Sequence, residues 1–373
     1  MKTLITCAAL AALQFVAAPA AVAQAKEQFF PLLVYRTGPY SPNGTPWANG
    51  KQDYIKLINA RDGGVNGVKL TFEECETGYA TDKGVECYER LKGKGASVFD
   101  PQATGITFAL TDKVPNDKIP LITLGYGLSA SADGGVFAWN FPLMGSYWTA
   151  ADVLIQHLGK KEGGLDKLKG KKIALVYHDS PFGKEPIPVL EERQKMHGFE
   201  LVKIPVTAPG VEQKSAWLEV RKQRPDYVLL WGWGVMNSTA LKEAQATGYP
   251  REKMYGVWWS GAEPDIVPAG DGGKGYNALT FMAPAGTAPN TVIEIDKGPA
   301  ERVVSPPKSG HAPFEAAFAN PSANCASHSS RQLSGSDNAI TKPSGVAPFA
   351  ARSERFTPKA FSAIASAGSS AKK

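Results

Sequence analysis

The chain has 373 residues and a formal net charge of +6 at pH 7, from 41 Lys and Arg against 35 Asp and Glu. This length allows two domains and a well-buried core. Residues 301–373 carry nine basic and four acidic residues, which leaves residues 26–300 close to neutral. The composition therefore does not predict a basic face that binds nucleic acid.

The N-terminus has the pattern of an exported protein. An alanine-rich apolar run extends from Leu4 to about Ala21 and is followed by small residues at alternate positions up to Ala25. We predict that residues 1–25 are a secretory signal peptide and that the mature protein is periplasmic. A membrane anchor is the alternative, but the alanine-rich composition and the cleavage pattern disfavour it.

Cysteine usage agrees with an oxidising compartment. Cys75 and Cys87 are the only cysteines in the body of the mature chain, and Cys325 stands alone near the C-terminus. A pair 12 residues apart favours a disulfide over a metal site, because the nearest histidine is His157. We therefore predict a Cys75–Cys87 disulfide and no bound metal or cofactor.

From Phe30 onwards, short apolar runs alternate with amphipathic ones. The loop TGPYSPNGTPWANG follows the first run, and the next helix places Tyr54, Ile55 and Ile58 on one face and ends at Gly63-Gly64. Alternation of this kind predicts a parallel sheet that is covered on both faces. The predicted strands lie at 32–35, 68–72, 96–99 and 120–124, and the helices at 48–61, 82–91 and 106–113.

The same alternation restarts after a break at 137–142. The predicted strands lie at 172–177, 201–206, 227–231 and 254–259. The predicted helices lie at 147–158, 215–222 and 237–246, with another that follows the loop 178–183 and ends at about residue 197. The predicted fold class is α/β, with two doubly wound, Rossmann-like lobes around a central ligand cleft. Residues 26–141 form the N-terminal lobe of this prediction, and residues 142–282 form the C-terminal lobe.

The strand-end loops carry the candidate ligand contacts. The segment IPLITLGYGLSAS, residues 119–131, is an apolar strand that stops at Gly-Tyr-Gly, and α/β sheets bind ligands at such turns. An ordinary strand-to-loop turn is the alternative. Trp233 and Trp259 stand beside glycines just past their strands, so we expect them to face the cleft opposite Tyr126. Trp231 and Trp258 continue apolar strands and are predicted to be core residues.

The order and spacing of these motifs resemble the leucine/isoleucine/valine-binding protein family, the type I periplasmic solute-binding proteins of ABC importers. The resemblance runs from about Phe30 to Pro284. It rests on TGPYSPNG, ANGKQDYIKLINARDGGVNGVKL, the turn after 120–124, VYHDSPFG and Tyr227–Gly234. It implies two lobes joined by three crossings that close on a small molecule like a Venus flytrap, without chemistry. It also implies an ABC importer permease in the inner membrane as partner, and we expect a monomer.

The resemblance also carries over ligand contacts. They are Asn43, Ala103, Thr104, Tyr126, Gly127 and Ser129 in the first lobe, and Phe182, Trp233, Trp259 and Ser260 in the second. Where the family places a glutamate for the substrate ammonium, this chain has Trp259-Ser260, and the nearest acid is Glu263. An amino group would enter a cleft without a matching charge, which is costly. An aromatic or other small carboxylate is therefore favoured over an amino acid.

The alternating pattern stops beyond about Asp296. In residues 301–373, 36 of the 73 positions are Ser, Ala or Pro, and neither Trp nor Tyr occurs. We predict a return crossing towards the first lobe at 283–299 and an irregular, low-complexity tail at 300–373. The abrupt change also fits a chain that has lost its original C-terminal reading frame.

Two other functions fit the sequence less well. A hydrolase would need Ser129, His178 and Asp179 as a triad, but adjacent His and Asp residues in one loop do not orient each other well, and Gly-x-Ser-x-Gly is absent. A ligand-sensing module for a membrane receptor would have the same two lobes. The sequence favours the importer subunit over both alternatives.

Overall fold

The computed structural model describes residues 26–281, 293–294 and 303–304. The chain divides into two units, Met1–Ala285 and Gly286–Lys373. The second unit is described only in a short antiparallel pair, β10 (Ile293–Glu294) and β11 (Val303–Val304). The predicted signal peptide, Cys325 and almost all of the predicted return crossing and tail lie outside the described residues.

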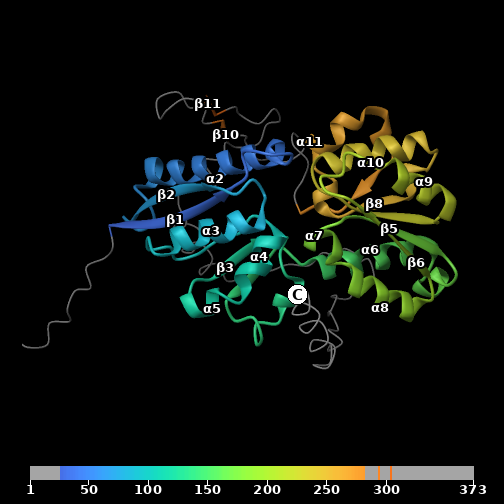
Figure 1. The fold of residues 1–373 in the computed structure, drawn as a ribbon, viewed down its shortest axis with the longest axis horizontal. Helices are drawn as coiled ribbons and strands as arrows, with labels where there is room; N and C mark the ends of the chain where they lie inside the picture. The colour runs from blue at the N-terminus through green and yellow to red at the C-terminus, as the bar shows by residue number, and fades with distance from the viewer. Residues whose placement is uncertain (1–25, 282–292, 295–302, 305–373) are drawn as a thin grey trace, which may run out of the picture. The chain divides into compact units, whose positions relative to one another are not determined.

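The first half of the larger unit contains two parallel strand pairs (Figure 1). They are β1 (Glu27–Val34) with β2 (Lys69–Glu76), and β3 (Leu121–Leu124) with β4 (Asn140–Leu143). The strand expected at 96–99 is reduced to two isolated bridges, Phe29 with Ala96 and Phe99 with Leu121. The helices of this half are α2 (Ser41–Asp62), α3 (Thr81–Lys92), α4 (Thr104–Thr111) and α5 (Val114–Asp117).

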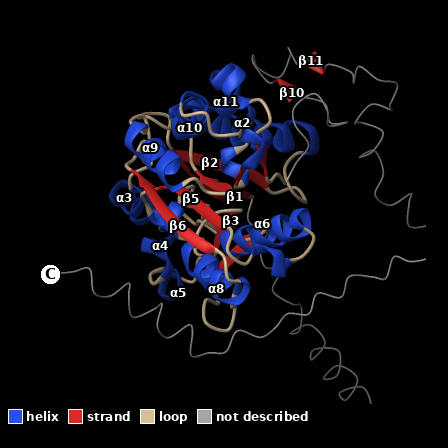
Figure 2. Cartoon of the chain, turned by 90° about the vertical axis from the view of Figure 1, so that its right-hand side faces the viewer, coloured by secondary structure: helices blue, strands red, loops and turns tan. Residues whose placement is uncertain are grey.

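The second half contains a five-stranded sheet, parallel throughout, in the order β6-β5-β7-β8-β9. Helices lie on both sides of the strands (Figure 2). The strands are β5 (Lys172–His178), β6 (Glu200–Val206), β7 (Tyr227–Trp231), β8 (Met254–Gly256) and β9 (Asn277–Ala278). The helices are α6 (Tyr147–Glu162), α7 (Pro181–Lys184), α8 (Ile187–His197), α9 (Lys214–Gln223), α10 (Val235–Ala246) and α11 (Glu263–Ile266). The predicted α/β class is confirmed.

Continuous apolar runs form the central strands because both faces of the sheet are covered. Successive side chains of a strand point to opposite faces. Leu175 and Leu229 belong to one core cluster, and their neighbours Val176 and Leu230 belong to another. Trp217 of α9 is fully buried in the second cluster. Among the described residues, no helix combines the length and apolar composition needed to cross a membrane.

Helix α2 corrects two predictions. It begins at Ser41 rather than at about residue 48, so most of the predicted loop is helical. Proline suits the first turn of a helix, where Pro42 stands, but the helix also continues through Pro46. Tyr54 was expected on the buried face and is 64% exposed, whereas Ile55 is buried as predicted. Gly63 ends the helix in the left-handed conformation, with φ 71°.

The predicted disulfide is present. Cys75 near the end of β2 is bonded to Cys87 of α3, with a distance of 5.7 Å between their Cα atoms. Both cysteines lie in a buried cluster with Leu33, Tyr88 and Phe99. The bond therefore fixes α3 against the first strand pair from inside the core.

Candidate ligand-binding site

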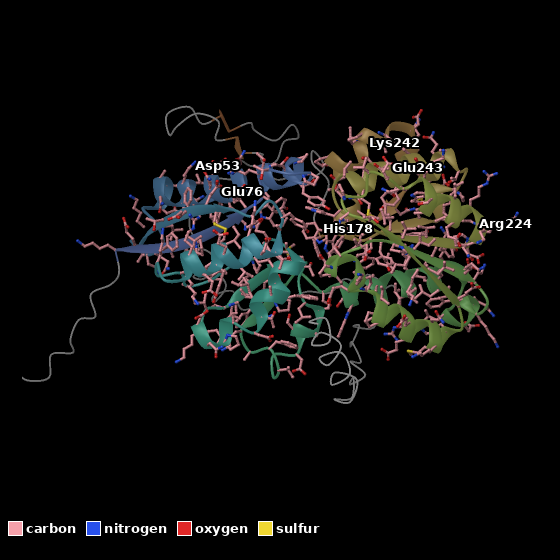
Figure 3. All side chains as sticks on the ribbon, viewed as in Figure 1. Asp53, Glu76, His178, Arg224, Lys242 and Glu243 are labelled. Atoms are coloured by element: carbon pink, nitrogen blue, oxygen red, sulfur yellow. A yellow bond between two sulfur atoms is a disulfide. The ribbon has the colours of Figure 1, made fainter. Side chains whose placement is uncertain are left out.

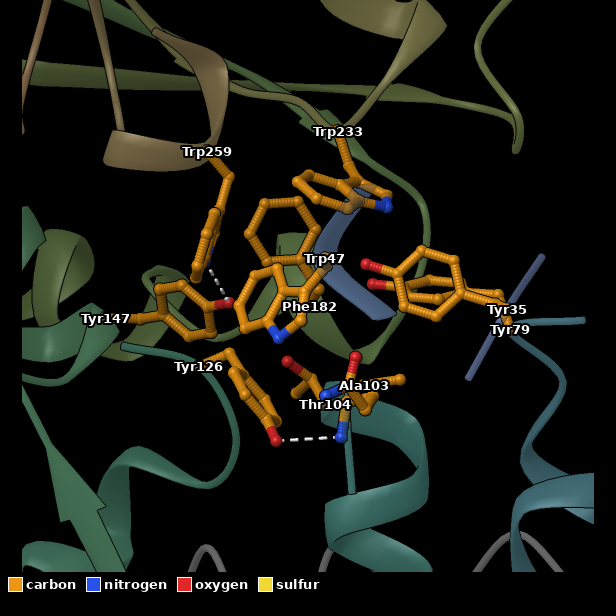
Figure 4. Close-up of a pocket in the computed structure, with 11 residues that line it drawn as sticks. Tyr35, Trp47, Tyr79, Ala103, Thr104, Tyr126, Tyr147, Phe182, Trp233 and Trp259 are labelled. Carbon is orange, nitrogen blue, oxygen red and sulfur yellow. Dashed lines mark hydrogen bonds between the residues drawn. The ribbon is translucent and has the colours of Figure 1, made fainter. Parts of the chain in front are cut away.

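Loops and helices at the carboxyl ends of strands from both halves meet around one cavity (Figure 4). Tyr35 and Tyr126 follow β1 and β3, and Trp233 follows β7. This is the edge at which parallel sheets bind ligands. The lining residues are Tyr35, Trp47, Tyr79, Gln102, Ala103, Thr104, Tyr126, Tyr147, Phe182, Trp233 and Trp259. The cavity volume is about 20 Å³, which is space for about one water molecule.

Aromatic rings fill most of the site. Trp259 lies edge-on to Trp233, with 5.6 Å between the ring centroids, and 5.7 Å from Trp47. Trp233 is also nearly parallel to Tyr79, at 6.3 Å and an interplanar angle of 24°. On another wall, the rings of Tyr147 and Phe182 are 5.2 Å apart. Flat faces and ring edges are therefore available from several directions.

Asp100 orders one side of the cavity. Its carboxylate pairs with Lys51 and accepts hydrogen bonds from the Tyr126 hydroxyl and, at 3.0 Å, from Gln102 Nε2. The backbone N–H of Gln102 donates to the Tyr126 hydroxyl at 2.7 Å. Burial and the charge of Asp100 raise the pKa of Tyr126 well above its usual value, so its hydroxyl stays protonated. Thr104, at the start of α4, accepts from the Gly127 N–H at 3.3 Å.

Two tryptophans join the halves at one carbonyl. Nε1 of Trp258 and Nε1 of Trp259 both donate to the Gly125 carbonyl oxygen, at 2.8 and 3.2 Å. Nε1 of Trp259 also donates to the Tyr147 hydroxyl at 3.0 Å. Trp258 was predicted to continue a core strand. The strand is wrong, because β8 ends at Gly256 and Trp258 opens a 3₁₀ turn, but its half-buried ring packs against the core.

A buried carboxylate forms a second link. Asp265 accepts a hydrogen bond from Asn43 Nδ2 of α2 at 3.0 Å and from Asn237 Nδ2 of α10 at 2.9 Å. Burial raises the pKa of Asp265, and the two amide donors oppose that shift. Asp265, rather than Glu263, is therefore the acid enclosed near the site. No Asp or Glu is among the eleven lining residues.

His178 forms a third link (Figure 3). Its Nε2 lies 2.7 Å from the Tyr40 hydroxyl, and its Nδ1 lies 2.8 Å from Ser180 Oγ. Burial lowers the pKa of His178 to about 4 and raises that of Tyr40 to about 12, so both are neutral at pH 7. Its ring is bonded to these two hydroxyls and not to Ser129, so the geometry does not assemble the triad of a hydrolase.

Six of the ten residues predicted as ligand contacts line the cavity: Ala103, Thr104, Tyr126, Phe182, Trp233 and Trp259. The other four lie outside it. Asn43 is bonded to Asp265, and Gly127 to Thr104. The Ser129 N–H donates to Glu185, and Ser260 Oγ is buried among backbone groups of Leu230 and Gly232.

Sequence reasoning missed five lining residues: Tyr35, Trp47, Tyr79, Gln102 and Tyr147. Tyr35 and Tyr79 follow the ends of β1 and β2, so the rule that ligands bind past strand ends could have found them. Trp47 lies in a segment rich in turn-forming residues, which predicts a loop where the structure has helix α2. Within the described part of the chain, no group of His, Cys, Asp or Glu is placed to hold a metal ion.

Glu185 gives a prediction on pH. Its carboxylate accepts the Ser129 N–H at 2.8 Å, and burial raises its pKa to about 7. The pKa of Glu185 is therefore higher in the folded protein than its value of about 4.5 in the unfolded chain. Protonated Glu185 then contributes its full stabilisation below pH 4.5, and this contribution is lost as the pH rises through 7. Between pH 5.5 and 8 we expect wild type to lose about 2 kcal/mol more unfolding free energy than Glu185→Gln.

Urea unfolding at both pH values measures this difference. The comparison with Glu185→Gln cancels the effect of His178, which has the opposite pH dependence and is present in both proteins. The glutamine still offers an oxygen to the Ser129 N–H. Equal pH slopes in the two proteins would show that Glu185 titrates normally.

A larger hollow lies beside the site and shares Trp47 with it. It has a volume of about 510 Å³ and lies between α2 and the first strands, against Phe30, Leu32, Ile122 and Leu124. Polar side chains are few there, so it lacks the converging polar groups of a specific small-molecule site.

Strand ends from both halves of the larger unit share one aromatic cavity, an arrangement suited to binding a small molecule. A family model for periplasmic binding proteins matches residues 27–292. This chain belongs to the periplasmic binding protein family, whose type I members bind small molecules, work with ABC transporters and are periplasmic. No curated protein sequence matches the chain.

Solved structures agree. A protein of the Pseudomonas fluorescens group, described as an ABC transporter permease, is 45% identical, with a TM-score of 0.61 over 68% of this chain and 62% of its own. A branched-chain amino acid ABC transporter protein from Thermus thermophilus with bound valine is 22% identical, with a TM-score of 0.58 over 66% and 63%. A solute-binding protein from R. palustris in complex with benzoate is 20% identical, with a TM-score of 0.56 over 68% of each chain. The chain thus spans less than two thirds of the length of the first two of these proteins.

Proposed function

We propose that this protein captures a small aromatic carboxylate between its lobes and delivers it to the permease of an ABC importer. The observation that carries the proposal is the composition of the cavity wall. Eight of the eleven lining residues are aromatic, and none is acidic. An aromatic ring gains from stacking and from removal of apolar surface from water. An α-amino group would find no carboxylate among these side chains.

Support also comes from the polar groups on the α4 side. Thr104, at the start of α4, lines the cavity and offers its hydroxyl to a carboxylate. The fold is shared with a structure that holds benzoate and with one that holds valine, so the fold alone does not choose between the ligands. The absence of acidic side chains from the cavity wall favours a benzoate-like ligand over an amino acid.

The mechanism follows from contacts made by both halves. Residues 26–141 and 142–282 act as the two lobes, and a ligand that touches both favours the closed form by its differential affinity. The permease then recognises the closed form. We propose a periplasmic monomer without catalytic activity. A sensor module would use the same closure, and neighbouring permease genes distinguish the two roles.

Thermal unfolding of residues 26–373 tests the proposal. A ligand at 100 times its dissociation constant adds about 2.7 kcal/mol, which raises the melting temperature by a few degrees. We expect this shift with benzoate and not with leucine. Trp259→Ala should weaken benzoate binding at least about tenfold, because it removes a wall of the cavity. A shift with leucine alone would contradict the proposal.

A further inference from the structure

One buried donor in the cavity has no acceptor. Trp233 is 6% exposed and lines the cavity, and its Nε1 has no hydrogen-bond partner among the described residues. A buried N–H that stays unpaired is destabilising. Nε1 of Trp231 is also unpaired, but Trp231 lies in the core and does not line the cavity. Only the Trp233 donor is placed where a ligand could satisfy it.

Two hydroxyls lie on the same side. Tyr35 and Tyr79 point their hydroxyls into the cavity, on the side of the nitrogen edge of Trp233 (Figure 4). Their rings are 5.0 Å apart and edge-on. Burial raises the pKa of both phenols, so they remain protonated donors at neutral pH. Tyr79 reaches this position from a left-handed backbone, with φ 65°, which is an unfavourable conformation for a tyrosine.

These donors lie away from the side where the carboxylate is proposed to bind. Ala103 and Thr104 stand at the start of α4, across the cavity from Trp233 (Figure 4). We infer that Trp233, Tyr35 and Tyr79 form a second polar subsite, which takes a hydroxyl or carbonyl oxygen at the far end of the ligand's ring. The inference rests on the proposed function because it concerns the same cavity, and it narrows the ligand to ring compounds with oxygen at both ends.

The unpaired indole N–H of Trp233 affects which ligands the cavity accepts. Trp Nε1 can only donate, so it requires an acceptor and gains nothing from a C–H group. A ligand without the far oxygen leaves the buried donor unpaired, and sites built to bind a hydroxyl reject analogues that lack it. A para-hydroxyl should therefore improve affinity at least about tenfold.

Calorimetric titration of residues 26–373 tests this with two pairs of probes. Benzoate is compared with 4-hydroxybenzoate, and benzamide with 4-hydroxybenzamide. We expect the hydroxylated member of a pair to bind at least about tenfold tighter in wild type, and Trp233→Phe to reduce this preference to less than about threefold. Tyr79→Phe keeps the ring but removes the hydroxyl, so it should also reduce the preference for the hydroxylated probe. It replaces Trp233→Phe in the test if that variant does not fold.

Trp259→Phe is the matched control. Nε1 of Trp259 already donates to the Gly125 carbonyl oxygen and to the Tyr147 hydroxyl. The loss of this N–H should therefore weaken the binding of both probes in a pair equally. Equal affinity within both pairs, or no binding by any probe, would overturn the subsite. So would an equal loss of benzoate and 4-hydroxybenzoate binding in Trp233→Phe, because Nε1 would then hold the carboxylate. If 4-hydroxybenzamide binds more tightly than benzamide while neither carboxylate binds, the result would support the subsite and contradict the proposal that the ligand is a carboxylate.

Discussion

Gly44→Ala is expected to lower the free energy of unfolding by about 3 kcal/mol, near the upper end of the usual overpacking effects. A methyl group on Gly44 of α2 would overlap the carbonyl oxygen and the ring of Tyr35. The clash involves backbone, so a rotamer change cannot relieve it. Because Tyr35 lines the cavity, α2 and this wall would have to move apart, and ligand binding should weaken together with stability.

Gly50→Ala is the matched control within the same helix. A Cβ atom there meets nothing within 4 Å. Alanine is favoured over glycine in a helix by about 1 kcal/mol, so this variant should be slightly more stable than wild type. Urea unfolding of the three proteins measures the difference. Equal effects of the two substitutions would contradict the close contact between Gly44 and Tyr35.

Removal of the Cys75–Cys87 disulfide is expected to cost about 3 kcal/mol, because an open loop of this length gains conformational freedom in the unfolded chain. The cysteines are 12 residues apart and both are buried. The double variant Cys75→Ala/Cys87→Ala should unfold at a lower urea concentration than wild type. A reductant should lower the free energy of unfolding of wild type towards that of this variant.

The double variant itself provides the control. Reductant should leave its unfolding curve unchanged, since the only predicted bridge is already absent. If wild type is equally insensitive, the bond contributes nothing to stability. A loss of the expected size would mean that the fold depends on an oxidising compartment, which agrees with the proposed periplasmic location.

Strong periodic signals predicted most elements of the fold. The strand at Tyr227–Trp231 was predicted with its observed bounds, because an apolar run covered on both faces has clear ends. The start of α2 was not predictable from local preferences. Its first ten residues contain two prolines and two glycines, and the packing of Gly44 against Tyr35 overrides their low helix propensity.

The cavity was only partly predictable for the same reason. Residues just past strand ends, such as Tyr126 and Trp233, could be assigned from sequence because topology brings those loops together. Trp47 enters the site only because α2 begins early. Asp265, and not Glu263, is the enclosed acid because it accepts hydrogen bonds from two amide side chains distant in sequence. Such pairings over long sequence separations leave no local signal.

The small free volume of the cavity, about 20 Å³, has a kinetic consequence. A ring compound cannot enter the space of about one water molecule, so the cavity must open before the solute binds. Binding then follows opening, and the observed association rate reaches a ceiling at high solute concentration. That ceiling is the opening rate, which depends on breaking the links between the halves at Gly125, Asp265 and His178 and not on diffusion of the solute.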